Sequence, residues 1–321
     1  MKKTVGIVGA NGYTGSELIR LLAFHPHVTL SFLYSRSNSG KRISDLYPDL
    51  TTVCEMVLTH QPEEVDVLFL CLPHKESQNW LAQNPVSDET LVVDLGNDFR
   101  LDENFESRNF VYGLPEINKK QLEGSKSIAN PGCFATAIQL ALLPLAEKGF
   151  LDEVFTTGIT GSTGAGQSLQ ATTHFTWRND NVSAYKTLTH QHVDEVLQQL
   201  VSSNQKQVNL NFVPWRGDFA RGIFTSSTLK TDLEQKEIEQ LYQDFYAEAP
   251  FVTVSSRAID LKQVVNTNRC VIQIEKNENV AVIHSAIDNL LKGASGQAVQ
   301  NMNIAMGWEE NKGLDLKPVA F

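Results

Sequence analysis

The chain opens with a short apolar run followed by a periodic one. Residues 4–8 (TVGIV) have the length of a buried strand, and glycines follow at positions 9, 12 and 15. Apolar residues then recur at helical spacing, at Leu18, Ile19, Leu21 and Leu22, until His25 precedes a proline. This pattern predicts a strand, a glycine turn and a helix.

Three more short apolar runs follow, at residues 28–35 (VTLSFLYS), 66–73 (DVLFLCLP) and 91–96 (LVVDLG), with helix-like or loop segments between them. Buried parallel strands alternating with helices are typical of a doubly wound sheet. We therefore predict an α/β fold in which about the first 130 residues form a Rossmann-type dinucleotide domain.

The pattern changes after residue 131. One long apolar segment (134–150) and a glycine-rich loop (160–168, TGSTGAGQS) precede longer alternating strands at 222–230 and 270–276. This change predicts a separate α+β domain. Thr231 and Glu234 have the spacing of a capping box and predict the start of a helix there, and residues 288–308 predict a further helix.

Composition narrows the classes of function. The 27 basic and 37 acidic residues give a net charge of −10, which disfavours nucleic acid and anionic membranes as partners. No apolar stretch approaches the roughly 20 residues of a membrane span. The four cysteines have no zinc-like or disulfide spacing, and the N-terminus does not resemble a signal peptide, so we expect reduced thiols and a cytoplasmic location.

Gly9, Gly12 and Gly15 form a G-x-x-G-x-x-G pattern between the first strand and the first helix. Glycines at this position let backbone N–H groups approach a pyrophosphate, and the helix N-terminus adds partial positive charge. A tight turn without a ligand is the alternative. The flanking strand and helix favour the cofactor loop.

The residues after the second strand bear on the choice of cofactor. They read LYSRSNSGKR, and no acidic residue that could hold both ribose hydroxyls of NAD occurs before Asp45. Ser35 and Arg36, with Ser37 and Lys41 or Arg42, could bind a 2′-phosphate, which favours NADP. An ordinary solvated basic loop explains these residues equally well.

Cys133 follows Pro131-Gly132 and begins the long apolar segment. A thiol at a helix N-terminus is more easily deprotonated, so we predict that Cys133 is a nucleophile and that Cys54, Cys71 and Cys270 are buried apolar residues. His190 and His192 precede an amphipathic segment and could supply proton transfer. A metal pair is the weaker hypothesis because no third ligand has suitable spacing, so we expect no metal site.

Nine segments carry a family resemblance, in the order GANGYTGSELIRLL, LPH, DLGNDFRL, YGLPE, NPGCFAT, GSTGAG, HQH, RGIF and AIDNLLKGASGQAVQNMN. The chain resembles, nearly end to end, the N-acetyl-gamma-glutamyl-phosphate reductases of arginine biosynthesis. That family is itself similar to aspartate-semialdehyde dehydrogenases. The resemblance implies NADPH-dependent reduction of an acyl phosphate to a semialdehyde through a cysteine thioester.

The resemblance also implies roles for individual residues. Cys133 is the expected nucleophile and His190 the expected acid/base. Arg100 is the expected phosphate ligand, and Arg221 a substrate-side arginine, for which a surface or interdomain ion pair is the alternative. Together with the candidates from the residues themselves, the expected cofactor-binding set is Gly9, Asn11, Gly12, Tyr13, Thr14, Gly15, Ser35, Arg36, Ser162, Gly164 and Asn289.

The implied organisation has two domains. Residues 1–130 with 287–321 form the dinucleotide-binding domain, and residues 131–286 form a catalytic and dimerisation domain. The expected partners are a small acyl phosphate and further copies of the chain, in a dimer or tetramer.

Several positions depart from the family pattern. Ala135 stands where a proline is common, LPHK replaces LPHG, and a glutamine replaces arginine inside the H-x-H element. The segments FTWRNDN (175–181) and VPWRGDFARG (213–222) are unusual, so the N-acyl group, acetyl or succinyl, stays open. An aspartate-semialdehyde dehydrogenase and a non-catalytic NADP-sensing regulator remain the alternative functions.

Overall fold

The chain divides into two compact units in a computed structural model that describes residues 1–319. The first unit is Met1–Pro131 with Ala294–Asp315, and the second is Gly132–Gly293 with the residues from Leu316 on. The sequence predicts that the chain returns to the first domain at residue 287. In the structure, the C-terminal residues of the first unit begin at Ala294. The last two residues of the expected 287–321 segment lie outside the described residues.

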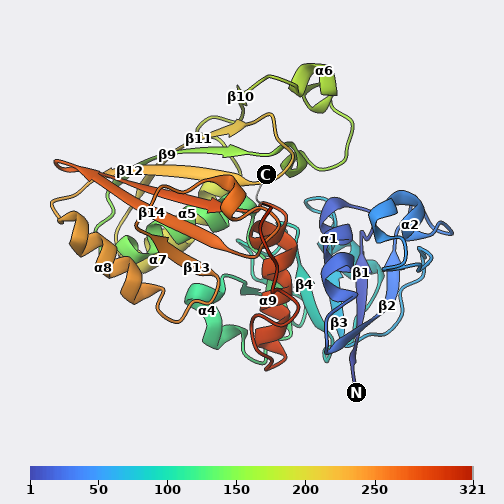
Figure 1. Cartoon of the computed structure of the whole chain (residues 1–321). Coiled ribbons are helices and arrows are strands. Elements are labelled where there is room, and N and C mark those ends of the chain that lie inside the picture. Colours follow the sequence, from blue (N-terminus) through green and yellow to red (C-terminus); the bar gives the residue numbers. More distant parts are fainter. Residues whose placement is uncertain (320–321) are drawn as a thin grey trace. The chain divides into compact units, whose positions relative to one another are not determined.

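The first unit is built on a six-stranded sheet in the order β2-β1-β3-β4-β8-β7, and every neighbouring pair is parallel (Figure 1). This sheet, with the mixed sheet of the second unit, confirms the predicted fold class. The strands are β1 (Lys3–Val8), β2 (Val28–Tyr34), β3 (Val67–Leu70), β4 (Leu91–Asp94), β7 (Val111–Tyr112) and β8 (Ser127–Ala129), and a small separate hairpin joins β5 (Asn104–Phe105) to β6 (Arg108–Asn109).

Helices complete the layers of the first unit. Trp80 and Leu81 of α3 pack with Val8, Leu70 and Val92, which share one face of the sheet, while α9 contacts α1 and α4. Apolar side chains on both faces of the strands explain why β3 and β4 are continuous buried runs. The helices are α1 (Tyr13–Leu22), α2 (Ile43–Leu46), η1 (Pro48–Leu50), α3 (Ser77–Gln83), α4 (Pro115–Leu122) and α9 (Gly296–Ala305).

The helix predicted over residues 288–308 forms only in part. Residues 288–290 are irregular, Leu291–Ser295 is a π-helical turn (η5), and α9 begins at Gly296. The side chain of Asp288 is the reason, because it accepts the N–H groups of Leu290 and Leu291 and so holds this stretch outside a regular α-helix.

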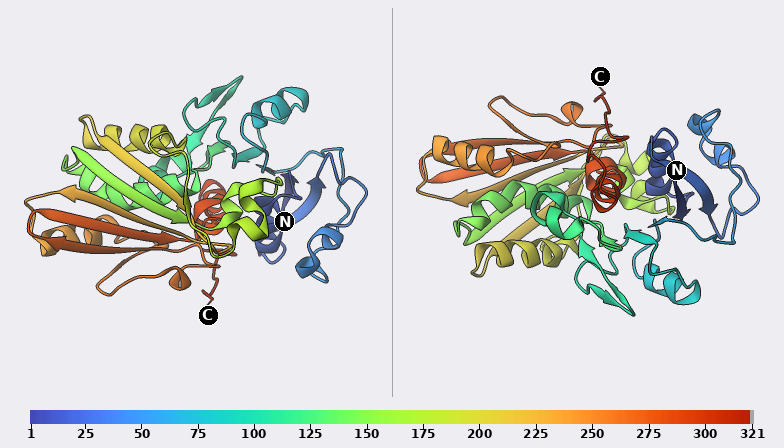
Figure 2. Two further views of the ribbon diagram at one scale, coloured as in Figure 1. Left: turned by 90° about the horizontal axis from the view of Figure 1, so that it is seen from above. Right: turned by 90° about the horizontal axis from the view of Figure 1, so that it is seen from below.

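The second unit is built on a seven-stranded mixed sheet in the order β10-β11-β9-β12-β15-β14-β13 (Figures 1 and 2). Strands β9 and β11 are parallel, and β12, β15 and β14 form an antiparallel series. The strands are β9 (Glu153–Thr160), β10 (Ser183–Ala184), β11 (Asn209–Arg216), β12 (Ile223–Lys230), β13 (Val252–Ser255), β14 (Cys270–Asn277) and β15 (Val280–Ile287).

Helices α5, α7 and α8 cover one face of this sheet (Figure 1). Alternate residues of β9 and β12 point toward the helices and are buried, whereas the other face carries partly exposed apolar residues such as Phe155 and Trp215. The helices are α5 (Cys133–Glu147), α6 (Phe175–Arg178), α7 (His192–Asn204) and α8 (Gln235–Phe245), with 3₁₀ turns η2 (Ser162–Ala165), η3 (Ala171–Thr173) and η4 (Leu261–Gln263).

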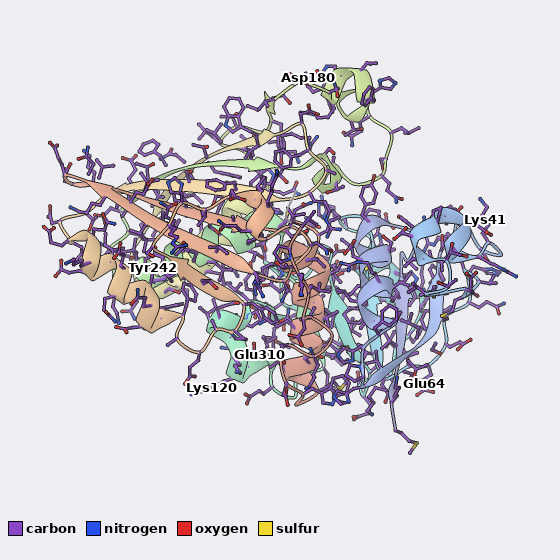
Figure 3. All side chains as sticks on the ribbon, viewed as in Figure 1. Lys41, Glu64, Lys120, Asp180, Tyr242 and Glu310 are labelled. Atoms are coloured by element: carbon purple, nitrogen blue, oxygen red, sulfur yellow. The ribbon has the colours of Figure 1, made fainter. Side chains whose placement is uncertain are left out.

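Helix α5 is buried along almost its whole length although it contains Pro144. A proline has no N–H group, so the carbonyl of Leu140, four residues earlier, loses its helical donor. The Tyr246 hydroxyl donates to this carbonyl at 2.6 Å, and the Tyr242 hydroxyl of α8 donates to Ala141 (Figure 3). Residues of α8 and its C-terminal end therefore satisfy backbone groups of the central helix.

The start predicted for α8 is wrong by one turn. The Thr231 hydroxyl accepts the N–H of Leu233, which forms a local turn before the helix. Glu234 is the N-cap residue, and the Glu237 carboxylate accepts the Glu234 N–H at 2.7 Å. Both residues can form boxes of this kind, and the local turn at Thr231 decides between them.

Candidate active site

Cys133 is the first residue of α5, and the extended Gly132 precedes it as N-cap. Cys133 is partly exposed, and Cys54 and Cys270 are buried as predicted, whereas Cys71, also predicted to be buried, keeps part of its surface exposed. Burial raises the pKa of the Cys71 thiol to about 12, which keeps that group protonated. Among the four cysteines, Cys133 has the position that suits a nucleophile, because N–H groups at a helix start favour negative charge.

Glu195 fixes the backbone that carries Cys133. Its carboxylate accepts the N–H of Gly132 at 2.8 Å, and its own carbonyl accepts the side-chain amide of Gln139. Glu195 is buried on α7, three residues after His192. Glu195 was not predicted as a site residue, and its place in the segment HQHVDE was the only signal in the sequence.

Gly293 packs against Cys133 from the opposite end of the unit's sequence. A Cβ atom at position 293 would lie 2.7 Å from the Cβ of Cys133 and 3.1 Å from its Cα. Real Cβ atoms do not approach other carbons this closely. Only glycine therefore fits beside Cys133 without displacing the start of α5.

His190 is buried just before α7. Its Nδ1 accepts the backbone N–H of His192 at 3.2 Å, so the neutral ring carries its proton on Nε2. Burial lowers the pKa of His190 to about 4, and the positive charges of Lys186 and Arg216 act in the same direction. At neutral pH His190 is therefore an uncharged hydrogen-bond donor.

Tyr185 connects the cysteine and the histidine. The ring centroids of Tyr185 and His190 lie 5.6 Å apart, and the Arg216 guanidinium lies 4.6 Å above the Tyr185 ring. Burial, reinforced by the charge of Cys133, raises the pKa of Tyr185 to about 12. Cys133 and His190 thus share Tyr185 as a neighbour. Tyr185 was not predicted as a site residue from the sequence.

Arg221 forms an ion pair inside the second unit. Its Nε lies 3.0 Å from one carboxylate oxygen of Asp288 and its Nη2 lies 3.1 Å from the other. Asp288 is fully buried and also accepts the N–H of Asn266. Arg221 does form an ion pair, but the pair lies within one unit and its carboxylate is buried, so it is neither the surface nor the interdomain pair of the alternative interpretation; a substrate role for Arg221 stays a prediction.

The second glycine loop is held by Asn289. The Asn289 amide oxygen accepts the N–H of Gly222 at 2.7 Å, and its NH₂ group donates to the Thr163 hydroxyl at 3.0 Å. Ser162 donates its N–H to the carbonyl of Phe219, and Gly164 lies close to the Asn289 side chain. Asn289 lies in the turn before the terminal helix and belongs to the second unit.

The first glycine loop has the geometry expected of a dinucleotide turn. Gly9 has a φ of +79°, and a Cβ there would meet the backbone of Cys71 at 2.3 Å. A Cβ at Gly15 would meet the Gly9 carbonyl oxygen at 2.6 Å, and Gly12 is the N-cap of α1. Two of the glycines are therefore required by conformation or by close approach.

The other loop candidates are held by neighbours in the same unit. The Tyr47 hydroxyl donates to the carbonyl of Asn11 at 2.9 Å, and the Ser295 hydroxyl donates to the carbonyl of Thr14 at 2.8 Å. Tyr13 is the first residue of α1, and its carbonyl accepts the Ser16 hydroxyl. Hydrogen bonds thus fix the backbone of Asn11, Tyr13 and Thr14, and cofactor binding by these residues stays a prediction.

Ser35 and Arg36 occupy different environments. Ser35 is buried, and its hydroxyl accepts the N–H of Asn38 at 3.2 Å. Arg36 is exposed, and a hydrogen bond with Tyr34 raises its pKa. Lys41, in the loop before α2, donates to the Asn38 side chain (Figure 3).

Arg100 is buried in the first unit. Its Nε donates to the carbonyl of Asn130 at 2.9 Å and its Nη2 donates to the carbonyl of Leu95 at 3.0 Å. These bonds tie together the segments that follow β4 and β8. Arg100 therefore has a structural role, and its role as a phosphate ligand stays a prediction.

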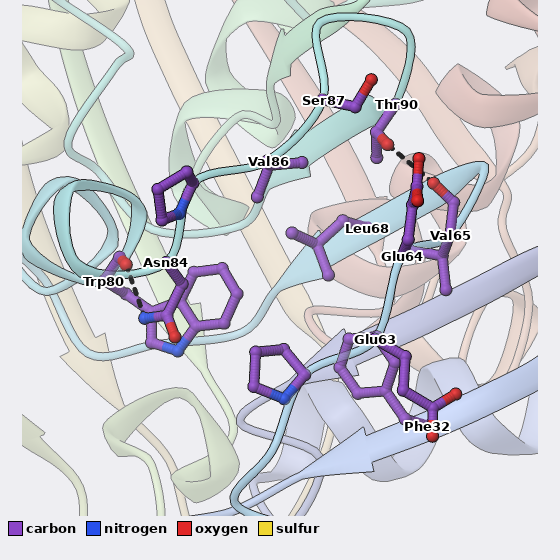
Figure 4. A pocket seen from close by; sticks show the side chains of 12 residues that line it. Phe32, Glu63, Glu64, Val65, Leu68, Trp80, Asn84, Val86, Ser87 and Thr90 are labelled. Carbon is purple, nitrogen blue, oxygen red and sulfur yellow. Dashed lines mark hydrogen bonds between the residues drawn. The ribbon is translucent and has the colours of Figure 1, made fainter.

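A cavity of about 240 Å³ lies elsewhere in the first unit (Figure 4). Apolar side chains such as Phe32, Leu68 and Trp80 line it together with Glu63 and Glu64. None of the predicted site residues lines it. Within residues 1–319, no three His, Cys, Asp or Glu side chains are grouped so that they could hold a metal ion.

Comparisons with known proteins identify relatives of both units. Residues 4–125 match the family described as semialdehyde dehydrogenase, NAD binding domain, and residues 133–289 match semialdehyde dehydrogenase, dimerisation domain. A protein named N-acetyl-gamma-glutamyl-phosphate reductase from Flavobacterium johnsoniae is 50% identical over 99% of each chain. Proteins with the same name from Christiangramia forsetii and Bacteroides fragilis are 49% and 47% identical over 98% of this chain and 99% of theirs.

Solved structures agree on the fold. Aspartate semialdehyde dehydrogenase II from Vibrio cholerae, complexed with ASA, has a TM-score of 0.74 at 15% identity and covers 96% of this chain and 99% of its own. Aspartate semialdehyde dehydrogenase with NADP from Candida albicans has a TM-score of 0.70 at 17% identity, covering 95% and 99%. At these identities the likeness shows the fold alone. No helix of the described residues is long and apolar enough to cross a membrane.

Proposed function

Because the chain belongs to the family of N-acetyl-gamma-glutamyl-phosphate reductases, we propose that it reduces N-acetyl-gamma-glutamyl phosphate to the semialdehyde and releases phosphate. The family membership confirms the resemblance stated from sequence motifs, and with it an oxidoreductase that forms an aldehyde from an acyl phosphate. The pathway, the covalent mechanism and the roles of single residues are parts of the proposal.

The observation that carries the proposal is the position of Cys133. It lies at the N-terminus of a buried helix, its backbone is held by Glu195 and Gly293, and it shares the neighbour Tyr185 with His190. A partly exposed thiol in such surroundings suits nucleophilic attack on a carbonyl carbon.

Cys133 acts first as a thiolate that attacks the acyl carbon. The bond between that carbon and the phosphate oxygen breaks, phosphate leaves, and a thioester forms on the sulfur. NADPH, when bound, supplies the hydride that reduces this thioester. The resulting oxyanion collapses, the C–S bond breaks, and the aldehyde leaves with Cys133 restored as a thiolate.

His190 serves as the hydrogen-bond donor of this sequence. Its neutral ring has Nδ1 occupied by the His192 N–H, which leaves the proton on Nε2 for an oxyanion. A donor aimed at the developing negative charge lowers the barriers to both attack and collapse. This is the acid side of the acid/base role that the resemblance implies.

The cofactor belongs to the nicotinamide dinucleotides, since residues 4–125 match an NAD-binding domain. The glycine loop supports a pyrophosphate site, because Gly9 turns the chain at a φ of +79° and Gly12, the N-cap of α1, has no side chain in front of the helix N–H groups. The preference for NADP is our proposal and rests on the exposed Arg36 beyond β2. Ser162, Gly164 and Asn289 are proposed to lie near the nicotinamide.

We propose that Arg100 binds the phosphate of the substrate. Arg221 is proposed as a second arginine on the substrate side, and its ion pair with Asp288 fixes the orientation of its side chain. The chain carries a dimerisation domain. The face of its sheet without helices, which includes Phe155 and Trp215, supports a homodimer or a tetramer as the assembly. Among the described residues none of the four cysteines forms a disulfide, which supports the expected cytoplasmic location.

An assay in the direction of oxidation tests the function. NADP⁺ reduction should require phosphate and should proceed with N-acetyl- or N-succinyl-glutamate semialdehyde, and aspartate semialdehyde should react at least about a hundredfold more slowly. Faster reaction with aspartate semialdehyde would instead assign the chain to that substrate. NADP binding without turnover of any semialdehyde would indicate a sensing protein.

A further inference from the structure

The two segments that the family resemblance leaves unexplained, 175–181 and 213–222, meet in the second unit. Arg178 of the first segment is buried and donates to the carbonyl of Arg216 at 2.8 Å. Ser183 and Ala184 of β10 pair with Arg216 and Trp215 at the end of β11. The Arg178 side chain therefore lies against the backbone of Arg216, and the role of each arginine can be considered in turn.

Arg178 has a structural role. Its guanidinium donates to the carbonyls of Thr172 and Asn181 as well as to that of Arg216. These bonds fold the 172–183 loop against the end of β11. The Arg178 guanidinium thus bonds to backbone carbonyls, and one of these bonds fixes the backbone of Arg216.

The Arg216 side chain points to the face of the sheet that is covered by α5, the helix that begins at Cys133. Side chains alternate along a strand, so Arg216 shares a face with Phe212 and Pro214, which are buried. The Phe212 ring lies 5.5 Å from His190 and 5.1 Å from Phe134, the residue after Cys133. The Arg216 side chain therefore starts from the helix-covered face, four residues along β11 from Phe212, which contacts His190.

The guanidinium of Arg216 has incomplete bonding. It lies over the Tyr185 ring and is hydrogen-bonded to the Tyr185 side chain, whereas its Nε is buried without a hydrogen-bond partner among the described residues. No Asp or Glu of residues 1–319 forms an ion pair with it. Asp218, the acidic residue that acts on neighbouring Arg178, is instead bonded to the N–H of Asp180.

An arginine with a buried, unbonded nitrogen is costly unless an anion completes its bonding. The positive charge of Arg216 also acts on its neighbours: it adds to the lowering of the His190 pKa, which burial mainly causes, and it opposes the rise that burial causes in the Tyr185 pKa. Tyr185 in turn senses the charge of Cys133. The geometry agrees, because Arg216 and His190 both lie against the Tyr185 ring and Phe212 of the same strand packs against both His190 and Phe134.

We propose that Arg216 binds a carboxylate of the substrate beside Cys133 and so determines which acyl phosphate reacts. This inference rests on the proposed function. A planar guanidinium matches a carboxylate with two parallel hydrogen bonds, and Nε is one of the two donors such a pair uses. The carboxylate is either the α-carboxylate of the glutamyl group or the terminal carboxylate of an N-succinyl group.

Arg216→Gln, Arg216→Lys and wild type are compared in the oxidative direction with N-acetyl- and N-succinyl-glutamate semialdehyde. Arg257→Gln, an exposed arginine of the same unit, is the control. For Arg216→Gln we expect the KM of the semialdehyde to rise about tenfold to a hundredfold, with the KM values of phosphate and NADP⁺ unchanged. Arg216→Lys should restore only part of the loss, since an ammonium cannot form the paired bonds.

The two semialdehydes identify the carboxylate. An equal rise in KM for both supports binding of the α-carboxylate, and a rise confined to the N-succinyl compound supports binding of the acyl carboxylate. A rise in the KM of phosphate alone, or unchanged KM values in both Arg216 variants, would overturn the inference. If wild type itself turned over neither compound, the proposed function would fail instead.

A second readout does not depend on turnover. Semialdehyde should protect Cys133 from iodoacetamide in wild type, and about tenfold more semialdehyde should be needed in Arg216→Gln. Circular dichroism and thermal melting establish whether each variant is folded. If Arg216→Gln does not fold, Arg216→Lys carries the test, and equal protection in Arg216→Lys and wild type then counts against the inference.

Discussion

Replacing Gly293 by alanine tests whether the position of Cys133 limits catalysis. The new Cβ would lie 2.7 Å from the Cβ of Cys133, about 0.7 Å inside the 3.4 Å at which ordinary contact begins. It would also lie 3.1 Å from the Cα of Cys133, so rotating a side chain cannot relieve the overlap. The start of α5 must shift, and overpacking of this kind costs about 1–3 kcal/mol.

A displacement of about 1 Å at a reacting atom reduces rates about a hundredfold. We therefore expect Gly293→Ala to lower kcat by about that factor, measured as phosphate-dependent NADP⁺ reduction, while NADP⁺ binding measured by titration is retained. Gly124→Ala is the matched control, because Gly124 has a φ of +72° and open space around a Cβ. It should lose about 1 kcal/mol of stability and keep its kcat. A wild-type kcat in Gly293→Ala would refute the reasoning.

Three further predictions concern the cofactor, the pH dependence and the core. Arg36→Ala should raise the KM of NADPH about tenfold and leave that of NADH unchanged, and an unaffected NADPH titration would point to Lys41 or Arg42. Because the pKa of His190 is about 4 in the folded chain and near 6.5 when unfolded, its contribution to stability is complete above pH 6.5. That contribution, up to about 3 kcal/mol, should be lost as the pH falls toward 4. The difference in the free energy of unfolding between wild type and His190→Asn, measured with urea, should therefore shrink over this range, and a constant difference would contradict the shift in pKa. Tyr246→Phe should destabilise the fold by about 1–3 kcal/mol, since the Leu140 carbonyl next to Pro144 loses its donor, and an unchanged melting temperature would show that this bond contributes nothing.

The sequence predicts best the features that are local. The strand, glycine turn and helix at residues 3–22 follow from apolar spacing and from glycines that the backbone requires. The start of α5 at Cys133 follows from Pro131-Gly132 and the apolar run behind them. Neighbours in sequence decide these features, so the pattern alone is sufficient.

Contacts between distant segments were not predictable from the pattern. Glu195 bonds to Gly132 although 63 positions separate them, and Arg221 meets Asp288 across 67. Neither partner has a distinctive local pattern, because a glutamate on a helix and an aspartate in a turn are ordinary surface residues until the fold buries them.

One error came from two local rules in competition. Thr231 and Glu234 satisfy the capping-box pattern, yet the Thr231 hydroxyl bonds to Leu233 and Glu234 caps α8. Both arrangements satisfy an N–H group near a helix start, and their difference in free energy is small. Sequence spacing alone could not rank them.

The most direct test of the account is whether Cys133 forms a thioester with substrate. Wild type mixed with NADP⁺ and N-acetyl-glutamate semialdehyde without phosphate should release about one NADPH per active site and then stop. Mass spectrometry of the quenched protein should find one acyl group on the peptide that contains Cys133, and phosphate should discharge it. Cys133→Ser should show neither the burst nor the acyl group. An acyl group on another residue, or turnover by Cys133→Ser at the wild-type rate, would contradict the central claim.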